Sequence, residues 1–507
     1  MALALIRKTP SFARLRRVWE TTRRFWQEVL PTDENTNIVA SIAAQVIGST
    51  GPRLEIKGSL APADDRHQSP GSFHTYELRL GQTRLSVVWD PDHSRFITCD
   101  NLAYATQLLR KDVKTAITGK LTIEEPAGYG SQNKEWGTIA VDQVQAINDK
   151  EGNPVTYTPA IPILAEPRTF MALVPADKAL DLAQAIKTKY EREMGKVRNR
   201  LPLHLGVVYF HRRTPLRAAL DAGRRMLRQK PLGGETTWTV QETPAEQPGD
   251  KLLDPELKKD TAQFEKWYAV ELKQGERELT WRVPAVMGDG ATEDVWYPYV
   301  FLETDNDDSR VNGRQRAFKG LRPTANGAEA CWLVHVADLR ADDRVYFTPA
   351  TLDFEWLDTT GRRFEIAYDE NGRRRGRFTR PYLLDELEAL QMIWNTLSYH
   401  LTTNQIYILR DLVEARRLEW QVATNDPTFR QFCREAIANT GWLPGVAGEQ
   451  SHREGNKPWE VDGEDKPVWL SRWADYAAHG WLNDVVELYL QVMKAEPETA
   501  KKKEISQ

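Results

Sequence analysis

The chain has 507 residues, of which 28% are charged and 41% hydrophobic, and its formal net charge at pH 7 is −4. That length predicts two to four domains with sizeable cores, and the near-neutral charge excludes a global electrostatic attraction to nucleic acid. The opening MALALI is too short for a signal-peptide core, and no stretch approaches the roughly 18 apolar residues of a membrane helix. Three widely spaced cysteines, Cys99, Cys331 and Cys433, fit a reducing cytoplasm and offer no zinc-ligand spacing.

The N-terminal region, residues 1–35, is predicted to be a basic amphipathic helix. Its apolar set is Leu15, Val18, Trp19, Phe25, Trp26 and Val29, and its basic set is Arg16, Arg17, Arg23 and Arg24. The runs YELRL, LSVVW and TAITGKLTIE that follow are typical of strands, and they open a domain that we expect to span residues 36–235.

Within that domain, residues 168–227 alternate strand and helix patterns. Apolar runs at 170–174 and 203–210 predict buried strands, and each is followed by a helix with one apolar face. The first inner face is Ala179, Leu182, Ala183, Ile186 and Tyr190, and the second is Leu216, Ala219, Leu220, Gly223 and Leu227. Strand, helix, strand, helix in about sixty residues predicts an α+β, ferredoxin-like layer with helices on one side of a sheet.

Three further regions complete the chain. Residues 236–255 are rich in Glu, Pro and Gly and are expected to form an exposed linker. Residues 256–380 contain strand-like runs, WYAVEL, WYPYVFLE and CWLVHVADL, which predict a second mixed α/β region that is rich in strands. Residues 381–507 are expected to form a helical bundle, because apolar residues recur there at steps of four and three and a second helix is predicted from Asn404 to Trp420.

The stretch RTFMALVPADKALDLAQAIKTKYEREMGKVRNRLPLHLGVVYFHRRTPLRAALDAGRRML, residues 168–227, resembles the second palm domain of the large subunit of type III CRISPR effector complexes. In that family a Gly-Gly-Asp-Asp hairpin precedes the apolar strand, and its two carboxylates hold divalent metal against ATP. The matching positions here are Glu166, Pro167, Arg168 and Thr169. Both glycines and both aspartates are absent, proline lacks an N–H donor, and Arg168 would repel a metal ion. The resemblance thus implies a degenerate cyclase motif of the subtype III-C kind.

Two other segments carry the same resemblance. Residues 346–384 look like the family's connection between this palm and a C-terminal helical domain, and residues 11–30 are similar to a helix that precedes the palm. The chain contains no His-Asp dipeptide, which the family's nuclease domain requires. The resemblance therefore implies that this is the C-terminal half of a large subunit and that a separate partner chain carries the other half.

Two arginine clusters are candidate surfaces for RNA or other subunits. The first is Arg212, Arg213, Arg217, Arg224 and Arg228, joined by Arg225. An equally ordinary interpretation is a solvated helix face on which Asp221 pairs with Arg217 and Arg225. The second cluster is Arg362, Arg363, Arg373, Arg374, Arg375, Arg377 and Arg380, around a turn predicted at residues 369–372. Its alternative is a charged edge that prevents aggregation.

These observations predict a structural subunit that binds crRNA, target RNA and other effector subunits, with no catalytic residue, metal or cofactor of its own. Two alternatives remain open. One is a nucleotide-binding or nucleotidyl-transferase subunit completed by carboxylates of a partner chain. The other is a stand-alone RNA-binding regulator, whose affinity for RNA would be sensitive to salt.

Overall fold

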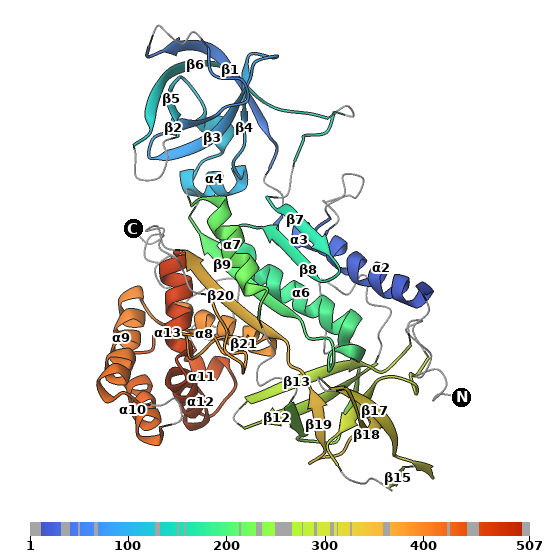
Figure 1. Ribbon diagram of the computed structural model, residues 1–507. Coiled ribbons are helices and arrows are strands. Elements are labelled where there is room, and N and C mark those ends of the chain that lie inside the picture. The colour runs from blue at the N-terminus through green and yellow to red at the C-terminus, as the bar shows by residue number, and fades with distance from the viewer. Residues whose placement is uncertain are drawn as a thin grey trace. The chain divides into compact units, whose positions relative to one another are not determined.

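A computed structural model describes residues 12–31, 41–48, 51–64, 69–126, 132–149, 152–156, 159–211, 214–229, 236–248, 266–275, 277–287, 292–304, 309–311, 313–324, 327–357, 366–422, 426–443 and 456–498 (Figure 1). The chain forms two compact units. The first comprises Met1–Ala185 and His211–Pro215, and the second comprises Ile186–Phe210 and Leu216–Gln507. The protein is mixed α/β, with several sheets and a C-terminal helical region.

The first unit begins with helix α2 (Phe12–Val29), which confirms the predicted amphipathic helix, and with the short α3 (Ile42–Ile47). Phe25 and Val29 are buried, and Trp26 stacks on Phe170 with ring centroids 4.8 Å apart. Two arginines of this helix pair with glutamates one turn later, Arg16 with Glu20 and Arg24 with Glu28.

Six antiparallel strands of the first unit close into a barrel in the order β1-β4-β3-β2-β5-β6. Their bounds are β1 (Leu54–Pro62), β2 (Thr75–Leu80), β3 (Thr83–Asp90), β4 (Arg95–Thr98), β5 (Lys120–Glu125) and β6 (Lys134–Ala146). Alternate residues such as Leu78, Leu85 and Val87 fill the interior, as the period of a strand requires. At the bulge in β1, a side chain on Gly58 would lie 2.1 Å from the carbonyl oxygen of Ala140, so only glycine fits there.

The predicted strands YELRL and LSVVW are therefore β2 and β3 of a barrel, within the range 36–235 that was expected to form the palm-like domain. TAITGKLTIE is only partly a strand. Between β4 and β5 the chain forms helices α4 (Leu102–Leu109) and α5 (Val113–Ala116), and Asp112 caps α5 by accepting the N–H of Thr115.

Residues 168–227 contain the predicted strands and helices in the predicted order. Strands β7 (Ile161–Glu166) and β8 (Thr169–Leu173) form a hairpin. The 3₁₀ turn Ala176–Lys178, α6 (Ala179–Met194), the 3₁₀ turn Gly195–Val197, β9 (His204–Phe210) and α7 (Leu216–Met226) follow. The predicted inner face of α6 is buried at all five positions.

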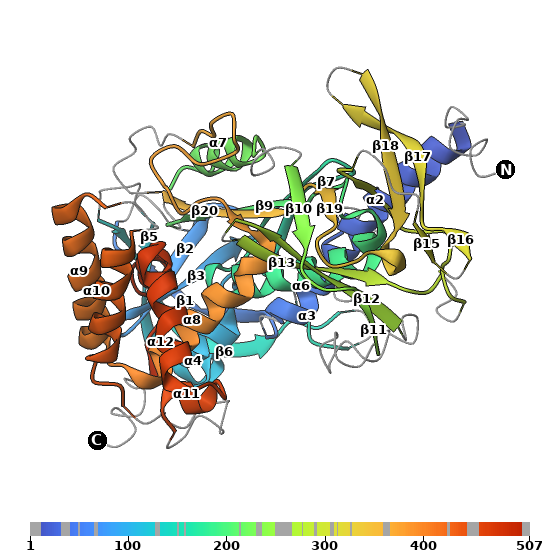
Figure 2. The same cartoon turned by 90° about the horizontal axis from the view of Figure 1, so that it is seen from below.

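The sheet arrangement differs from the predicted ferredoxin-like layer. Strand β8 pairs with β7 in a two-stranded sheet, whereas β9 pairs in parallel with β20 (Thr351–Leu357), which pairs with β21 (Tyr382–Leu383). The two apolar runs at 170–174 and 203–210 therefore do not share a sheet. Helix α7 covers one face of the β9–β20 pair (Figure 2), and a side chain on Gly206 would collide with Met226 at 2.8 Å.

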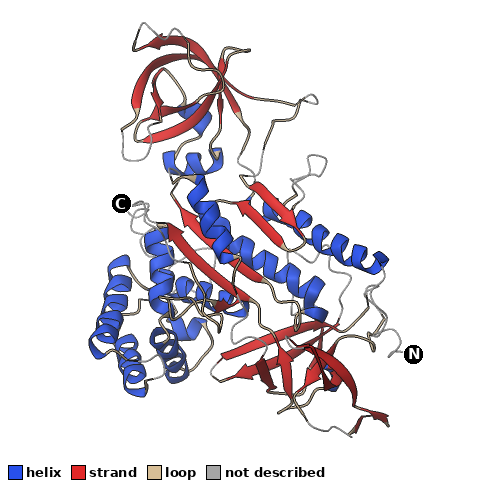
Figure 3. Cartoon of the chain, viewed as in Figure 1, coloured by secondary structure: helices blue, strands red, loops and turns tan. Residues whose placement is uncertain are grey.

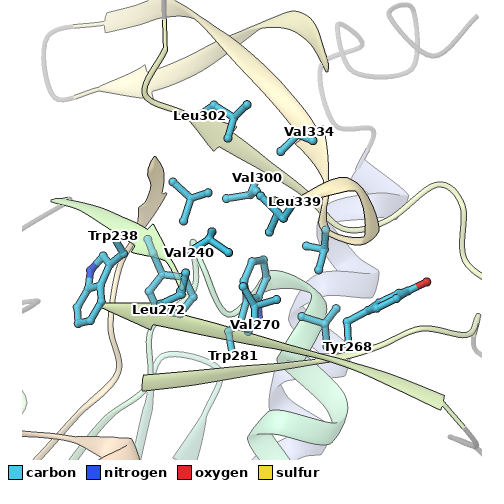
Figure 4. Close-up of a cluster of buried hydrophobic side chains, with 14 of the residues drawn as sticks. Trp238, Val240, Tyr268, Val270, Leu272, Trp281, Val300, Leu302, Val334 and Leu339 are labelled. Atoms are coloured by element: carbon cyan, nitrogen blue, oxygen red, sulfur yellow. The ribbon is translucent and has the colours of Figure 1, made fainter. Parts of the chain in front are cut away.

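A larger, eight-stranded sheet lies in the second unit, with the order β11-β12-β10-β19-β14-β18-β17 and β13 paired to β12. Its strands are β10 (Thr236–Val240), β11 (Ala245–Pro248), β12 (Lys266–Gln274), β13 (Arg277–Pro284), β14 (Tyr299–Leu302), β17 (Ala317–Thr324), β18 (Gly327–His335) and β19 (Arg344–Phe347). Strands β15 (Arg310–Val311) and β16 (Arg314–Gln315) form a separate pair, and a 3₁₀ turn spans Val336–Asp338. Trp238, Val270, Trp281 and Val300 belong to the core that this sheet encloses (Figure 4).

The expected linker, residues 236–255, is partly wrong. Its described part supplies β10 and β11, because alternate residues such as Trp238 and Val240 point into the core and outweigh the turn-forming composition. Residues 249–255 lie outside the described part of the chain.

The C-terminal region is helical, as predicted (Figure 3). A 3₁₀ turn (Leu384–Glu386) leads into α8 (Leu387–His400), α9 (Thr403–Trp420), α10 (Pro427–Ala438), α11 (Pro458–Val461), α12 (Lys466–Ala478), α13 (Trp481–Val486) and one π-helical stretch (Glu487–Val492). Thr402 caps α9 and exchanges hydrogen bonds with Gln405. Within the described ranges, no helix has both the length and the apolar character to cross a lipid bilayer.

Candidate RNA-contacting surfaces

Residues 166–169, the positions that the resemblance matches to a cyclase motif, form the turn of the β7–β8 hairpin. Glu166 pairs with Thr169 across the strands, and Pro167 and Arg168 make the two-residue turn. The side chains of Glu166 and Arg168 are exposed. The described residues contain no group of three or more His, Cys, Asp or Glu side chains arranged to hold a metal ion. A single carboxylate beside an arginine does not fit Mg²⁺, which prefers several oxygen ligands, so no catalytic step follows from this hairpin.

Helix α7 and the turn after it present the described part of the first arginine cluster. Arg217, Arg224 and Arg228 are exposed, and no carboxylate oxygen of the described residues lies within 4.0 Å of their guanidinium nitrogens. Only one of the two predicted ion pairs forms, between Arg225 and Asp221 at 3.0 Å. Arg212 and Arg213 lie outside the described residues.

Arg217 and Arg224 share one face of α7 because seven residues are close to two turns of a helix, and Arg228 lies in the turn that directly follows the helix. The opposite face buries Ala219, Ala222 and Met226 against β9. The result is a row of positive charges fixed on a packed helix, a spacing suited to successive phosphate groups.

The second arginine cluster follows the predicted turn. Asp369 Oδ1 accepts the backbone N–H groups of Asn371 and Arg373, both at 2.9 Å, and Gly372 has a φ of +76° that favours glycine. Beyond the turn Arg373 and Arg375 are exposed, whereas Arg362 and Arg363 lie outside the described residues.

The prediction that this segment presents its arginines outward is wrong for Arg374. This side chain is 4% exposed and pairs with Asp353 at 3.1 Å and with Glu355, both on β20. Tyr368 also donates its hydroxyl to Asp353 at 2.5 Å. Burial raises the pKa of Asp353, and the charge of Arg374 counteracts that shift. Arg374 therefore closes a buried charged cluster.

Arg380 is likewise buried, at 1% exposure, and is not available to a ligand. Its guanidinium pairs with Asp484 of α13 at 3.1 Å and donates to the carbonyl oxygen of Phe354 at 2.6 Å. Thr379 and Tyr382 also donate to Asp484. Burial acts to raise the pKa of Asp484, but Arg380 and these hydrogen bonds outweigh it, so that the pKa is lowered. This carboxylate remains ionised and ties the arginine segment to the C-terminal helices.

Arg377 is intermediate between these cases. It is half-buried, lies 4.8 Å above the ring of Trp356 and pairs with Glu487 at 3.4 Å. Of the second cluster's described members, only Arg373 and Arg375 are left on the surface with no carboxylate of the described residues within 4.0 Å.

The sequence interpretation overlooked the carboxylates that neutralise these arginines. Asp353 and Glu355 alternate with Leu352, Phe354 and Trp356 in an otherwise largely apolar strand. Acidic residues are rarely buried without a partner, so two of them inside such a strand were a signal that nearby arginines would turn inward. Asp484, in contrast, carries no local signal, because its partner is 104 residues away.

Comparisons with known proteins leave the chain without an identified relative: no family model, no curated protein and no solved structure matches it.

Proposed function

We propose that this chain is a structural component of the large subunit of an RNA-guided type III CRISPR effector complex, with an inactive cyclase palm. In this role it binds crRNA, target RNA and other subunits, and a separate chain supplies the half that carries the nuclease domain. Base pairing then selects the target, while the protein recognises backbone and shape.

The observation that carries this proposal is the arginine row of α7. Arg217 and Arg224 on α7 and Arg228 in the turn after it are exposed, with no carboxylate of the described chain within 4.0 Å. Guanidinium groups form paired hydrogen bonds with phosphate oxygens and are weakly hydrated, so such a row favours a nucleic-acid backbone. The overall charge of −4 makes this a local attraction.

The order of elements supports the palm part of the proposal. A two-residue hairpin turn at Pro167 and Arg168 is followed by β8, α6, β9 and α7, the order that the resemblance implies. Because the turn offers one carboxylate and one arginine, the palm has a structural role in this proposal.

In one alternative, the hairpin at residues 166–169 takes part in catalysis. Glu166 is exposed, so carboxylates of a partner chain could complete a metal site beside it. This alternative requires a reconstituted complex in which turnover of ATP with Mg²⁺ depends on Glu166.

The test is a pull-down of the tagged protein expressed from its native operon, followed by mass spectrometry and sequencing of bound RNA. The proposal expects a repeat-derived guide RNA and several other subunits. Recovery of the protein alone, without RNA, would contradict it.

A matched pair of variants connects that result to α7. We expect the triple variant Arg217→Ala, Arg224→Ala, Arg228→Ala to weaken RNA binding by one to two orders of magnitude at low salt. The slope of the logarithm of the RNA-binding constant against the logarithm of the salt concentration should become shallower by about 2, since each phosphate contact to a single strand contributes about 0.7. The control is Arg225→Ala, on the same helix, whose charge is already paired with Asp221. Unchanged RNA affinity in the triple variant would exclude α7 as the binding face.

A further inference from the structure

A cleft of about 1240 Å³ lies within the second unit. One side is the β12–β13 hairpin, and the other sides are the 371–379 segment and residues of α8, α10 and α12. Its volume exceeds the roughly 300–1,000 Å³ of typical small-ligand sites, so a ligand of that size would fill only part of it. The hairpin motif at residues 166–169 is not part of it.

Most cations that line this cleft are already neutralised. Lys273 pairs with Glu278 at 2.5 Å, and Arg430 donates to Asp475 at 2.6 Å. A third pair joins Lys187 to Glu388 at 2.7 Å.

Other charged groups at the cleft are also paired. Arg282 pairs with Glu191 at 3.1 Å, and the buried Arg198 pairs with Asp385. Among the acidic lining residues, Glu271 accepts the hydroxyl of Thr280 at 2.9 Å. These groups hold the walls together, and their charges are largely satisfied.

Arg277 and Arg373 are the exceptions. Neither guanidinium has a carboxylate oxygen of the described residues within 4.0 Å, although both line the cleft. Arg277 begins β13 directly after the β12–β13 turn, and Arg373 follows the turn fixed by Asp369. Two hairpin tips, about a hundred residues apart in the sequence, thus bring two arginines to one cleft.

The two arginines are close enough to influence each other. Burial lowers the pKa of Arg277, Glu386 raises it, and the charge of Arg373 lowers it again. Glu386 neutralises the positive charges of Arg277 and Arg373 only in part. Its carboxylate accepts the N–H of Leu383 at 2.7 Å, and burial raises its pKa to about 7, which disfavours its charged form.

An aromatic wall faces the same space. Tyr476 and Trp481 stack with ring centroids 5.1 Å apart and an interplanar angle of 16°, and both line the cleft. Phe378, which is 51% exposed, also lines it and packs against Gly480. Aromatic faces of this kind suit a nucleobase, which stacks with little preference for its identity.

We propose that this cleft binds a nucleotide, with a phosphate group held between Arg277 and Arg373 and the base against Phe378, Tyr476 and Trp481. The ligand is a nucleoside phosphate, taken either from the free pool or from an RNA chain. The proposal does not depend on the effector function, since it rests only on the cleft and its charges.

Isothermal titration calorimetry of the full chain, in buffer with EDTA, tests the proposal with four probes: adenosine, inorganic phosphate, AMP and tetra-adenylate. We expect AMP or tetra-adenylate to bind at least ten-fold more tightly than adenosine or inorganic phosphate. Tighter binding of tetra-adenylate indicates an RNA source, and tighter binding of AMP indicates a free nucleotide. Failure of both at millimolar concentration would overturn the proposal.

Variants assign the binding to this cleft. Arg277→Ala and Arg373→Ala should each weaken it about ten-fold or more, the usual effect of losing a charged hydrogen bond. Arg277→Lys and Arg373→Lys retain the charge and should lose less affinity, which guards against a folding defect. Arg344→Ala is the control, because Arg344 is exposed, pairs with Glu303 and does not line the cleft. Unchanged affinity in both alanine variants would place the ligand elsewhere.

Discussion

Helix α7 and the segment of residues 366–380 are both rich in arginine, yet they use that charge differently. On α7 and in the turn after it three arginines are exposed with no described carboxylate within 4.0 Å, whereas in the segment Arg374 and Arg380 are buried against Asp353 and Asp484. The difference depends on carboxylates supplied from elsewhere in the chain. Arginine density alone therefore does not distinguish a binding surface from an internal tie.

The largest expected effect comes from breaking the buried tie at Arg380. Arg380→Ala leaves Asp484 charged and buried, so we expect a loss of about 3–5 kcal/mol in the free energy of unfolding. Urea denaturation followed by fluorescence would measure it. Arg375→Ala, an exposed arginine of the same segment, is the control and should change stability by less than about 0.5 kcal/mol. A similar small loss for Arg380→Ala would contradict the buried role.

A smaller loss is expected from Asp353→Asn. The amide keeps the shape of the carboxylate but removes its charge, and Arg374 retains Glu355 as a second partner. We expect destabilisation of about 1–3 kcal/mol, as for a buried group that loses part of its hydrogen bonding. A double-mutant cycle with Arg374→Met, measured by the same denaturation, would report the coupling of the pair. Additive effects would indicate that the two residues act independently.

The acid in the cleft adds a dependence on pH. The pKa of Glu386 is about 7 in the folded protein, above its ordinary value of 4.5, through burial, while Arg277 and His479 oppose the shift and Asp385 adds to it. The folded state therefore binds this proton more tightly than the unfolded state does. The resulting gain in the free energy of unfolding is fully present below pH 4.5 and is lost as the pH rises through about 7.

Glu386→Gln should remove this dependence. We expect it to stabilise the protein by about 2 kcal/mol at pH 8 and to have little effect at pH 4, with the amide still accepting the N–H of Leu383. Denaturation curves at both pH values would show this. Equal effects at the two pH values would show that Glu386 does not titrate between them.

Loss of the exposed arginines on α7 should leave stability almost unchanged. The triple alanine variant of Arg217, Arg224 and Arg228 is expected to unfold within about 0.5 kcal/mol of the natural protein, since exposed groups without partners contribute little. A loss above 2 kcal/mol would mean that these side chains support the fold, and α7 would resemble the 366–380 segment.

The smallest effect is expected at the hairpin. Purified protein with ATP and Mg²⁺ should produce no cyclic oligoadenylate, and Glu166→Ala should leave this unchanged. Chromatography of the products with radiolabelled ATP would detect turnover. Product formation that the variant abolishes would refute the inactive palm.

Local patterns predicted many elements of this fold. The apolar spacing of Leu387, Leu390, Trp394 and Leu397 predicted α8, and all four side chains are buried. The run of residues 170–174 and the face of α6 were predictable for the same reason. These elements depend on neighbours three or four residues away, which a sequence displays directly.

Pairing between distant segments was not predictable from one sequence. Nothing local indicates that β9 pairs with β20 or that Arg380 meets Asp484, because these contacts span 147 and 104 residues. The same limit applies to the candidate site. The turn before Arg373 was predictable. That Arg373 and Arg277 line the same cleft was not, because it depends on two hairpins that are distant in the sequence.

The pairing of β9 with β20 also constrains how the protein folds during synthesis. The barrel is contiguous, from Leu54 to Ala146, and can close as soon as it leaves the ribosome. Strand β9 can pair only after β20, 147 residues further along the chain, has been synthesised. At a translation rate of about 5–20 residues per second, this delay is roughly 7–30 s. During that interval the apolar edge of β9 is exposed to aggregation, so slow elongation after residue 210 should make nascent chains of this protein dependent on chaperones.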